Sequence, residues 1–151
     1  MKSNVFDIIV LGGGLVGLTT ANLCAQQGLS VALVERKAPL LEWNAAEYDF
    51  RCSAISRNSQ RIFQQIGVWD KIQQERISPF TKMFVWDAQG FGEIAFDAAE
   101  VAEPDLGHII ENRVMLKALW EKTKEDPNIT LLVPMNAVNI TVELDAAYLK
   151  L

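Results

Sequence analysis

Six residues near the N-terminus have the spacing of a phosphate-binding loop. Residues 12–17 fit the pattern G-x-G-x-x-G and directly follow residues 6–11, a run that is apolar except at Asp7. In such a loop the first glycine lets the strand turn, the second lets a pyrophosphate approach the backbone, and the third lets the helix pack closely on the strand. The free N–H groups and the positive end of the helix then face the phosphates. A purely structural turn could have the same pattern, so the surrounding elements decide between the two interpretations.

Three neighbouring features favour a dinucleotide site. Ala21 keeps the helix face toward the sheet small, and Gly28 ends the predicted helix. Glu35 ends the second predicted strand, where an acid accepts hydrogen bonds from the adenosine ribose hydroxyls. Its negative charge disfavours a ribose 2′-phosphate, so the site suits FAD or NAD rather than NADP. The cofactor-binding residues expected with Glu35 are Gly12, Gly14, Leu15, Val16 and Gly17.

The elements that hold this loop are predicted to form a βαβ unit. Residues 6–11 indicate a strand buried on both faces, because the run is apolar at every position except Asp7. A helix over 15–27 and a second strand over 31–34 complete the unit.

Beyond Glu35 the sequence departs from the alternating strands and helices of a nicotinamide-dependent dehydrogenase. It continues through a long loop, an amphipathic helix and an antiparallel hairpin, and this is where FAD-binding folds differ from dehydrogenases. FAD is therefore favoured, and NAD stays open as the alternative. The further elements expected are a loop over 38–50, helices over 58–66, 68–76 and 113–125, and strands over 82–87, 92–97, 108–111, 129–133, 139–144 and from 148 onward.

Composition excludes several other classes of function. The chain has 151 residues, which is the size of one domain, and its net charge of −5 argues against nucleic-acid binding. Its apolar runs are too short to span a bilayer. Two cysteines and one histidine provide neither a disulfide framework nor a usual zinc site, so no metal is expected. Six acids between residues 87 and 105 indicate a solvated hairpin and loop, with an acidic partner surface as the alternative.

Four segments together resemble the FAD-dependent hydroxylases of ubiquinone biosynthesis. They are residues 12–17 with Glu35, 51–56 (R-C-S-A-I-S), 66–69 (I-G-V-W) and 106–112 (L-G-H-I-I-E-N). The resemblance extends from Asp7 to Leu144, and the last three segments are specific to the subfamily. These enzymes belong to the flavoprotein aromatic hydroxylases typified by p-hydroxybenzoate hydroxylase. The chain is most similar to those acting on 2-octaprenylphenol and on later methoxy-benzoquinol intermediates.

The resemblance implies further contacts to FAD. Arg36 would lie beside the adenine end, and Arg51 near the pyrophosphate and ribityl chain. Asn112 would lie near the ribityl chain, and Val138 would offer a backbone contact to adenine. No residue is identified as catalytic.

The implied fold is α/β, with a Rossmann-like FAD-binding domain of the glutathione-reductase type and an inserted antiparallel hairpin. Residues 1–81 and 110–151 would form part of the FAD-binding domain, and residues 82–109 a segment of the substrate-facing β-sheet. Two further FAD motifs of the family do not occur, and the sequence stops at Leu151 within a strand-like pattern. We therefore expect an N-terminal fragment, incomplete at its C-terminus, of a longer enzyme.

The resemblance also implies a function. The chain would hold FAD in an aromatic hydroxylase that uses NAD(P)H as transient reductant and O₂, acts on a polyprenyl phenol, and has no transmembrane segment. The isolated chain is expected to be inactive. We expect a cytoplasmic protein, working against a membrane surface or within a ubiquinone-biosynthesis complex because the substrate is so apolar. An NAD-dependent dehydrogenase domain and a non-catalytic dinucleotide-binding fragment remain the alternatives.

Overall fold

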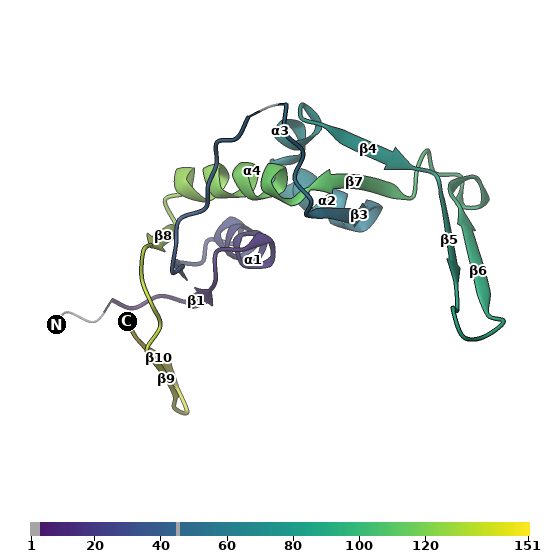
Figure 1. Cartoon of the computed structure of the whole chain (residues 1–151). Coiled ribbons are helices and arrows are strands. Elements are labelled where there is room, and N and C mark those ends of the chain that lie inside the picture. Colours follow the sequence, from purple (N-terminus) through teal and green to yellow (C-terminus); the bar gives the residue numbers. More distant parts are fainter. Residues whose placement is uncertain (1–3, 45) are drawn as a thin grey trace. The chain divides into compact units, whose positions relative to one another are not determined.

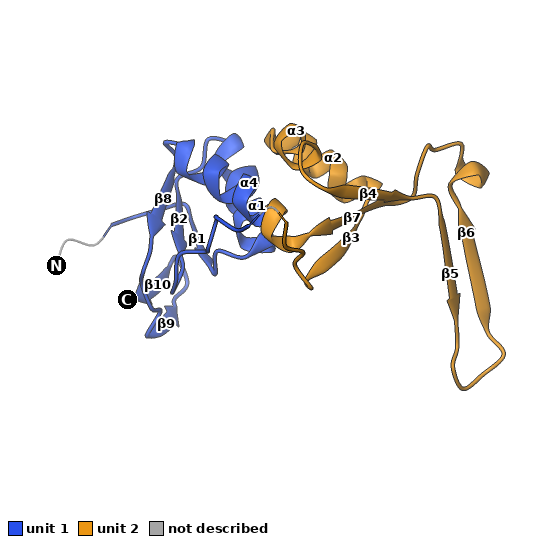
Figure 2. Ribbon diagram, turned by 45° about the horizontal axis from the view of Figure 1, so that its top comes forward, with its two compact units in different colours: residues 1–44, 116–151 blue, residues 45–115 orange. Residues whose placement is uncertain are grey.

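The computed structural model describes residues 4–44 and 46–151, and the chain forms two compact units. Unit 1 comprises residues 1–44 and 116–151, and unit 2 comprises residues 45–115 (Figure 2). The length is that of one domain, and the chain within it forms two compact units. The boundaries expected at residues 81 and 109 separate an FAD-binding part from a substrate-facing segment. They therefore divide the chain by function and not by compactness.

Unit 1 is built on a parallel three-stranded sheet in the order β1-β2-β8 (Figure 2), of which Figure 1 labels β1 and β8. The strands are β1 (Ile8–Leu11), β2 (Val31–Val34) and β8 (Ile129–Leu132). Leu11 pairs with Val34 and Val34 pairs with Leu132, so the carboxyl ends of all three strands lie at one edge. Helix α1 (Leu15–Gln26) connects β1 to β2, which confirms the predicted βαβ unit.

Two further parts of unit 1 follow later in the chain. Helix α4 (Asn112–Glu125) precedes β8, and it enters unit 1 at Leu116. Strands β9 (Asn139–Val142) and β10 (Ala147–Lys150) form an antiparallel hairpin after β8. Among the described residues, no helix has the length and hydropathy needed to cross a bilayer.

Burial in the parallel sheet differs from the prediction at its first strand. β2 is buried along its whole length, but β1 alternates between half-buried and exposed residues. Ile9 and Leu11 are 38% and 44% exposed. The prediction of a first strand buried on both faces is wrong, because Ile9 and Leu11 share one face of β1 and that face is left exposed. Among the described residues β1 is also an edge strand of this sheet, whereas β2 lies between two strands.

A buried polar pair links helices α1 and α4 inside unit 1. The Asn22 amide donates to Thr123 Oγ1 at 2.7 Å and to the Leu18 carbonyl at 2.8 Å. Both polar side chains are almost fully buried, and Trp120 is buried on the same helix as Thr123. Pairing matters here because an unpartnered polar group in a core costs more than a hydrogen bond returns.

Unit 2 contains an antiparallel sheet in the order β3-β7-β4. Its elements are β3 (Cys52–Ser56), α2 (Arg57–Ile66), α3 (Trp69–Gln73), β4 (Ile77–Phe80) and β7 (Gly107–Glu111). Helix α2 ends at Gly67, whose φ of +82° suits glycine, as its sequence position predicts. The sequence predicts a helix over 68–76, whereas α3 ends at Gln73 and β4, which contains Pro79, begins at Ile77. Proline is tolerated there because β4 is an edge strand.

The predicted hairpin is confirmed by β5 (Lys82–Trp86) and β6 (Glu93–Asp97), which pair antiparallel. A short 3₁₀ turn follows over Ala98–Val101. The hairpin forms a two-stranded arm of unit 2 in Figure 2. Its large apolar side chains are exposed, and they are Met83, Phe84, Val85, Trp86, Phe91, Ile94 and Phe96.

Candidate functional site

The three motif glycines occupy three different environments at the end of β1. Gly12 has φ +98°, a turn conformation that side chains rarely adopt, and its N–H donates to the Val34 carbonyl at 2.8 Å. A Cβ on Gly17 would lie 1.9 Å from the Gly12 carbonyl oxygen, so the helix approaches the loop as closely as glycine permits. A Cβ on Gly14 would meet nothing within 4 Å. Gly14 therefore faces open space, as expected of a residue over which a phosphate lies.

The N-terminus of helix α1 suits an anion. Its N-cap is Gly14, which provides no side-chain cap, and no acidic residue lies in the first turn. The first helical hydrogen bond runs from Leu18 N–H to the Gly14 carbonyl at 2.9 Å. The N–H groups of Leu15, Val16 and Gly17 thus precede the helical ladder, where a phosphate can accept from them.

Glu35 is bonded to the glycine loop itself. One carboxylate oxygen accepts from Gly13 N–H at 2.6 Å and the other from Lys37 N–H at 2.9 Å. The N–H of Lys37 and then that of Gly13 hold the pKa of Glu35 below its ordinary value, against a smaller opposing effect of burial. Glu35 is therefore ionised at neutral pH and can accept hydrogen bonds from ribose hydroxyls.

Gly13 packs closely against its neighbours, although it stands at a position of the G-x-G-x-x-G motif where any residue is allowed. A Cβ there would lie 3.0 Å from the Trp120 ring and 3.1 Å from Glu35 Cβ. Gly13 therefore lies between the acid and a buried tryptophan, and this contact explains why the middle of the three consecutive glycines has no side chain.

A cavity of about 320 Å³ opens at the carboxyl edge of the parallel sheet, beside the loop. Its volume is in the usual range for small-molecule sites. Glu35 and Arg36 line it together with a segment that no motif marks. The full lining is Leu11, Gly12, Val34, Glu35, Arg36, Met135, Asn136 and Ala137.

The segment 135–137 is brought to this cavity by strand register. Glu35 N–H donates to the Leu132 carbonyl at 3.1 Å, and Met135 N–H donates to the Glu35 carbonyl at 3.0 Å. The chain leaving β8 is therefore bonded to the chain leaving β2. The rule that ligands bind at the carboxyl ends of parallel strands is the signal that could have identified it.

Val138 lies next to this lining but not in it. Its side chain is 68% exposed, and its N–H donates to the Lys150 carbonyl at 2.7 Å in the β9–β10 hairpin. The adenine contact expected there remains a proposal.

In unit 2 the structure brings together the two other expected cofactor residues. Arg51 is exposed and directly precedes β3, and its carbonyl accepts from Asn112 N–H at 2.8 Å. The Asn112 side-chain oxygen accepts from Ser53 Oγ at 2.7 Å. The antiparallel pairing of Cys52 with Glu111 produces this neighbourhood.

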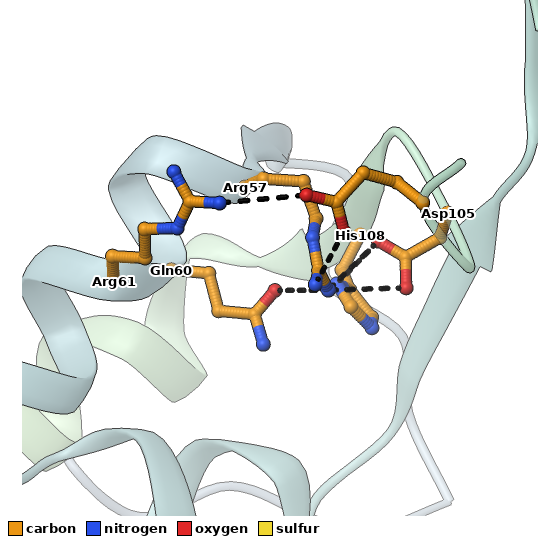
Figure 3. Close-up of polar contacts among 6 residues, drawn as sticks. Arg57, Gln60, Arg61, Asp105 and His108 are labelled. Atoms are coloured by element: carbon orange, nitrogen blue, oxygen red, sulfur yellow. Dashed lines mark hydrogen bonds and ion pairs between the residues drawn. The ribbon is translucent and has the colours of Figure 1, made fainter. Parts of the chain in front are cut away.

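A second polar cluster of unit 2 accounts for part of the acidic stretch (Figure 3). Arg57 pairs with Glu103 at 3.0 Å and with Asp105 at 3.4 Å, and Arg61 pairs with Glu103 at 3.4 Å. His108 is buried in this cluster, with its ring edge-on to Trp69. Neither sequence interpretation, a solvated loop or a partner surface, describes these two acids, because arginines of the same unit pair with them.

Comparison with known proteins decides the family. The FAD binding domain family matches residues 5–141. The chain belongs to this family. It is 34% identical to the 3-demethoxyubiquinol 3-hydroxylase of Escherichia coli over 151 residues, which cover 100% of this chain and 38% of that protein. It is 37% identical to the ubiquinone biosynthesis monooxygenase COQ6 of Dictyostelium discoideum, covering 86% of this chain and 29% of that protein. The chain thus spans less than two-fifths of these relatives.

Solved structures agree on the fold. The flavin-dependent monooxygenase PieE, solved with FAD and substrate, superposes with a TM-score of 0.70 at 15% identity, covering 97% of this chain and 27% of that one. The p-nitrophenol 4-monooxygenase PnpA of Pseudomonas putida gives 0.68 at 18% identity, covering 94% and 34%. The predicted Rossmann-like α/β fold is confirmed, and the family identifies FAD as the cofactor in preference to the NAD alternative.

The residues of unit 1 fit the adenosine-diphosphate half of FAD. Gly14 leaves room above an uncapped helix terminus, and the ionised Glu35 borders a cavity beside it. These are the two features that a pyrophosphate and a ribose require. Among the described residues, no cluster of His, Cys, Asp or Glu could hold a metal ion.

Proposed function

We propose that this chain is the FAD-holding N-terminal part of an aromatic hydroxylase of ubiquinone biosynthesis, which acts on a polyprenyl phenol with O₂ and NAD(P)H. The observation that carries the proposal is that the glycine loop, Glu35 and the cavity lie together at the carboxyl edge of the parallel sheet. The identity to a ubiquinol hydroxylase along the whole chain supports the reaction class.

When bound, FAD supplies the redox chemistry that activates O₂. The chain's own residues bind and orient it: the N–H groups at residues 15–17 hold the pyrophosphate, Glu35 accepts from the ribose hydroxyls, and Arg36 lies toward adenine. In unit 2, Arg51 would contact the pyrophosphate and ribityl chain, and Asn112, whose N–H donates to the Arg51 carbonyl, would contact the ribityl chain. Val138 contacts adenine through its backbone.

Segment 82–109 has exposed apolar side chains, which an apolar substrate can contact, so we assign it to the substrate-facing sheet. We assign residues 1–81 and 110–151 to the FAD-binding part. Phe84 and Trp86 lie on the same strand with their rings stacked, 5.9 Å apart at 26°. They are 54% and 66% exposed. Exposed aromatic surface of this kind suits a prenylated ring and a peripheral place at a membrane or in an assembly.

A chimera tests the reaction class. The matching segment of the Escherichia coli hydroxylase is replaced by this chain, and demethoxyubiquinol hydroxylation and bound-flavin absorbance are measured together. We expect a flavin-loaded, active chimera, and the same chimera with Gly14→Ala as its inactive control. A chimera that binds flavin but does not hydroxylate would contradict the proposal and favour a non-catalytic FAD-binding fragment.

A further inference from the structure

Glu111, which belongs to segment 106–112 and has no role assigned from the sequence, lies at the centre of a polar cluster in unit 2. Its side chain is 7% exposed, and its carboxylate pairs with Arg76 at 3.0 Å and with Arg113 at 2.6 Å. The same carboxylate accepts from Asp49 N–H at 3.1 Å. Burial by itself raises the pKa of Glu111, but the Asp49 N–H and the two guanidiniums together bring it below its ordinary value. The group is therefore charged at neutral pH.

The two arginines hold the same stretch of chain as Glu111 does. Both donate to the carbonyl oxygen of Glu47, Arg76 at 2.6 Å and Arg113 at 2.5 Å. The Arg76 guanidinium also lies over the Tyr48 ring, 4.1 Å from its centroid. Residues 47–49 lie outside the strands, so these charged contacts fix their backbone.

Arg51 is tied to this cluster through its own backbone. Its N–H donates to the Asp49 carboxylate at 3.1 Å, and its carbonyl accepts from Asn112 N–H at 2.8 Å. Asp49 is bonded to Glu111, and Asn112 is the residue that follows Glu111. The N–H of Arg51 is therefore bonded to a residue that the Glu111 carboxylate holds, and its carbonyl is bonded to the residue next to Glu111 in the chain.

We propose that Glu111 is a positioning residue, which fixes the backbone of Arg51 through residues 47–49 and so places the Arg51 side chain for FAD. The inference rests on the proposed function, because it takes Arg51 as a cofactor contact. Glu111 itself need not touch the cofactor, since a buried charge paired with two arginines can order a segment without contact to a ligand.

Amide hydrogen exchange of the chain without cofactor tests the positioning role directly. Glu111→Gln keeps the size and one acceptor oxygen but loses the charge, so we expect exchange at Asp49 and Arg51 to rise about tenfold. Glu103→Gln is the matched control, because it makes the same chemical change in another ion pair of unit 2 and should leave both amides unchanged. Unchanged exchange in Glu111→Gln would overturn the proposal.

Arg76→Gln provides a milder variant if Glu111→Gln fails to fold, because the Arg76 side chain is 40% exposed. We expect a smaller rise at the same two amides, and no rise would again overturn the positioning role.

A double-mutant cycle on FAD affinity tests whether Glu111 acts through Arg51. We expect Glu111→Gln and Arg51→Gln each to weaken binding about tenfold, and the double variant to be no weaker than Arg51→Gln alone. Additive losses would refute action through Arg51. An Arg51→Gln variant that binds FAD normally would instead refute the proposed cofactor role of Arg51, while the exchange result still decides whether Glu111 fixes the segment.

Discussion

Two alanine substitutions in one glycine loop should fail in different ways. A Cβ at position 17 would lie 1.9 Å from the Gly12 carbonyl oxygen, and a Cβ at position 14 would meet nothing within 4 Å. Gly17→Ala should therefore destabilise unit 1 whether or not FAD is present. Gly14→Ala should leave the fold intact and exclude the pyrophosphate, because its methyl group occupies the space above the helix terminus.

The magnitudes follow from the obstructing atoms. A backbone oxygen cannot rotate away as a side chain can, so Gly17→Ala should cost about 3 kcal/mol, the upper end for overpacking. In a chain of this length that corresponds to a fall in Tm of roughly 6–12 °C. Gly14 has φ −79°, which alanine adopts freely, so Gly14→Ala should change stability by no more than about 0.5 kcal/mol.

Thermal unfolding and FAD titration of both variants beside the wild-type chain distinguish the two effects. We expect Gly17→Ala to lose Tm, and Gly14→Ala to keep Tm but weaken FAD binding at least about tenfold. A Gly14→Ala chain that binds FAD as the wild type does would refute the assignment of the pyrophosphate to this loop. An unchanged Tm for Gly17→Ala would refute the close packing of loop and helix.

Four further predictions follow from named contacts. Glu35→Lys should weaken FAD binding about ten- to hundredfold, because an ammonium group cannot accept from ribose hydroxyls, and unchanged affinity in a fluorescence titration would remove Glu35 from the site. The pKa values of Glu35 and Glu111 in the folded chain lie below the ordinary 4.5. Their contribution to stability is therefore complete above pH 4.5 and should be lost as the pH falls through the lower folded values. Urea midpoints at pH 7 and below pH 4.5 check this loss, which should be smaller in Glu111→Gln. Asn22→Ala should lower the free energy of unfolding by about 1–3 kcal/mol, whereas exposed Thr20→Ala on the same helix should change it by no more than about 0.5 kcal/mol in urea titrations. Trp86→Ser in the chimera should raise the KM for the prenylated substrate and leave FAD affinity unchanged, and the reverse pattern would place the hairpin at the cofactor instead.

The local parts of the fold could be predicted because their signals are short. The loop pattern, the apolar run before it and the acid after β2 predict the βαβ unit from neighbouring residues alone. The exposure of β1 could not be predicted in this way, since an apolar run is typical of a strand covered on both faces, and what covers each face is a long-range property. The place of Pro79 in a strand could not be predicted for the same reason, because its tolerance depends on β4 being an edge strand.

The residues of the site that the sequence did not identify are those that strand register brings together. Residues 135–137 line the cavity because β8 pairs with β2, and this pairing joins residues about a hundred positions apart. The role of Glu111 could not be predicted from the sequence, because only the pairing of β3 with β7 places it beside the segment before Arg51. A motif identifies the residues that bind the phosphates, and the register of the strands identifies the residues that shape the rest of the site.

Titration of the purified chain with FAD, with NAD in parallel and ADP as competitor, tests the central claim most directly. If the glycine loop, Glu35 and the adjoining cavity hold the adenosine-diphosphate half of FAD, then FAD saturates the chain, ADP competes with it, and Gly14→Ala weakens FAD binding at least about tenfold. NAD carries the same half without the flavin, so it should bind more weakly than FAD. Saturation by NAD alone, or FAD binding that Gly14→Ala leaves intact, would contradict the account.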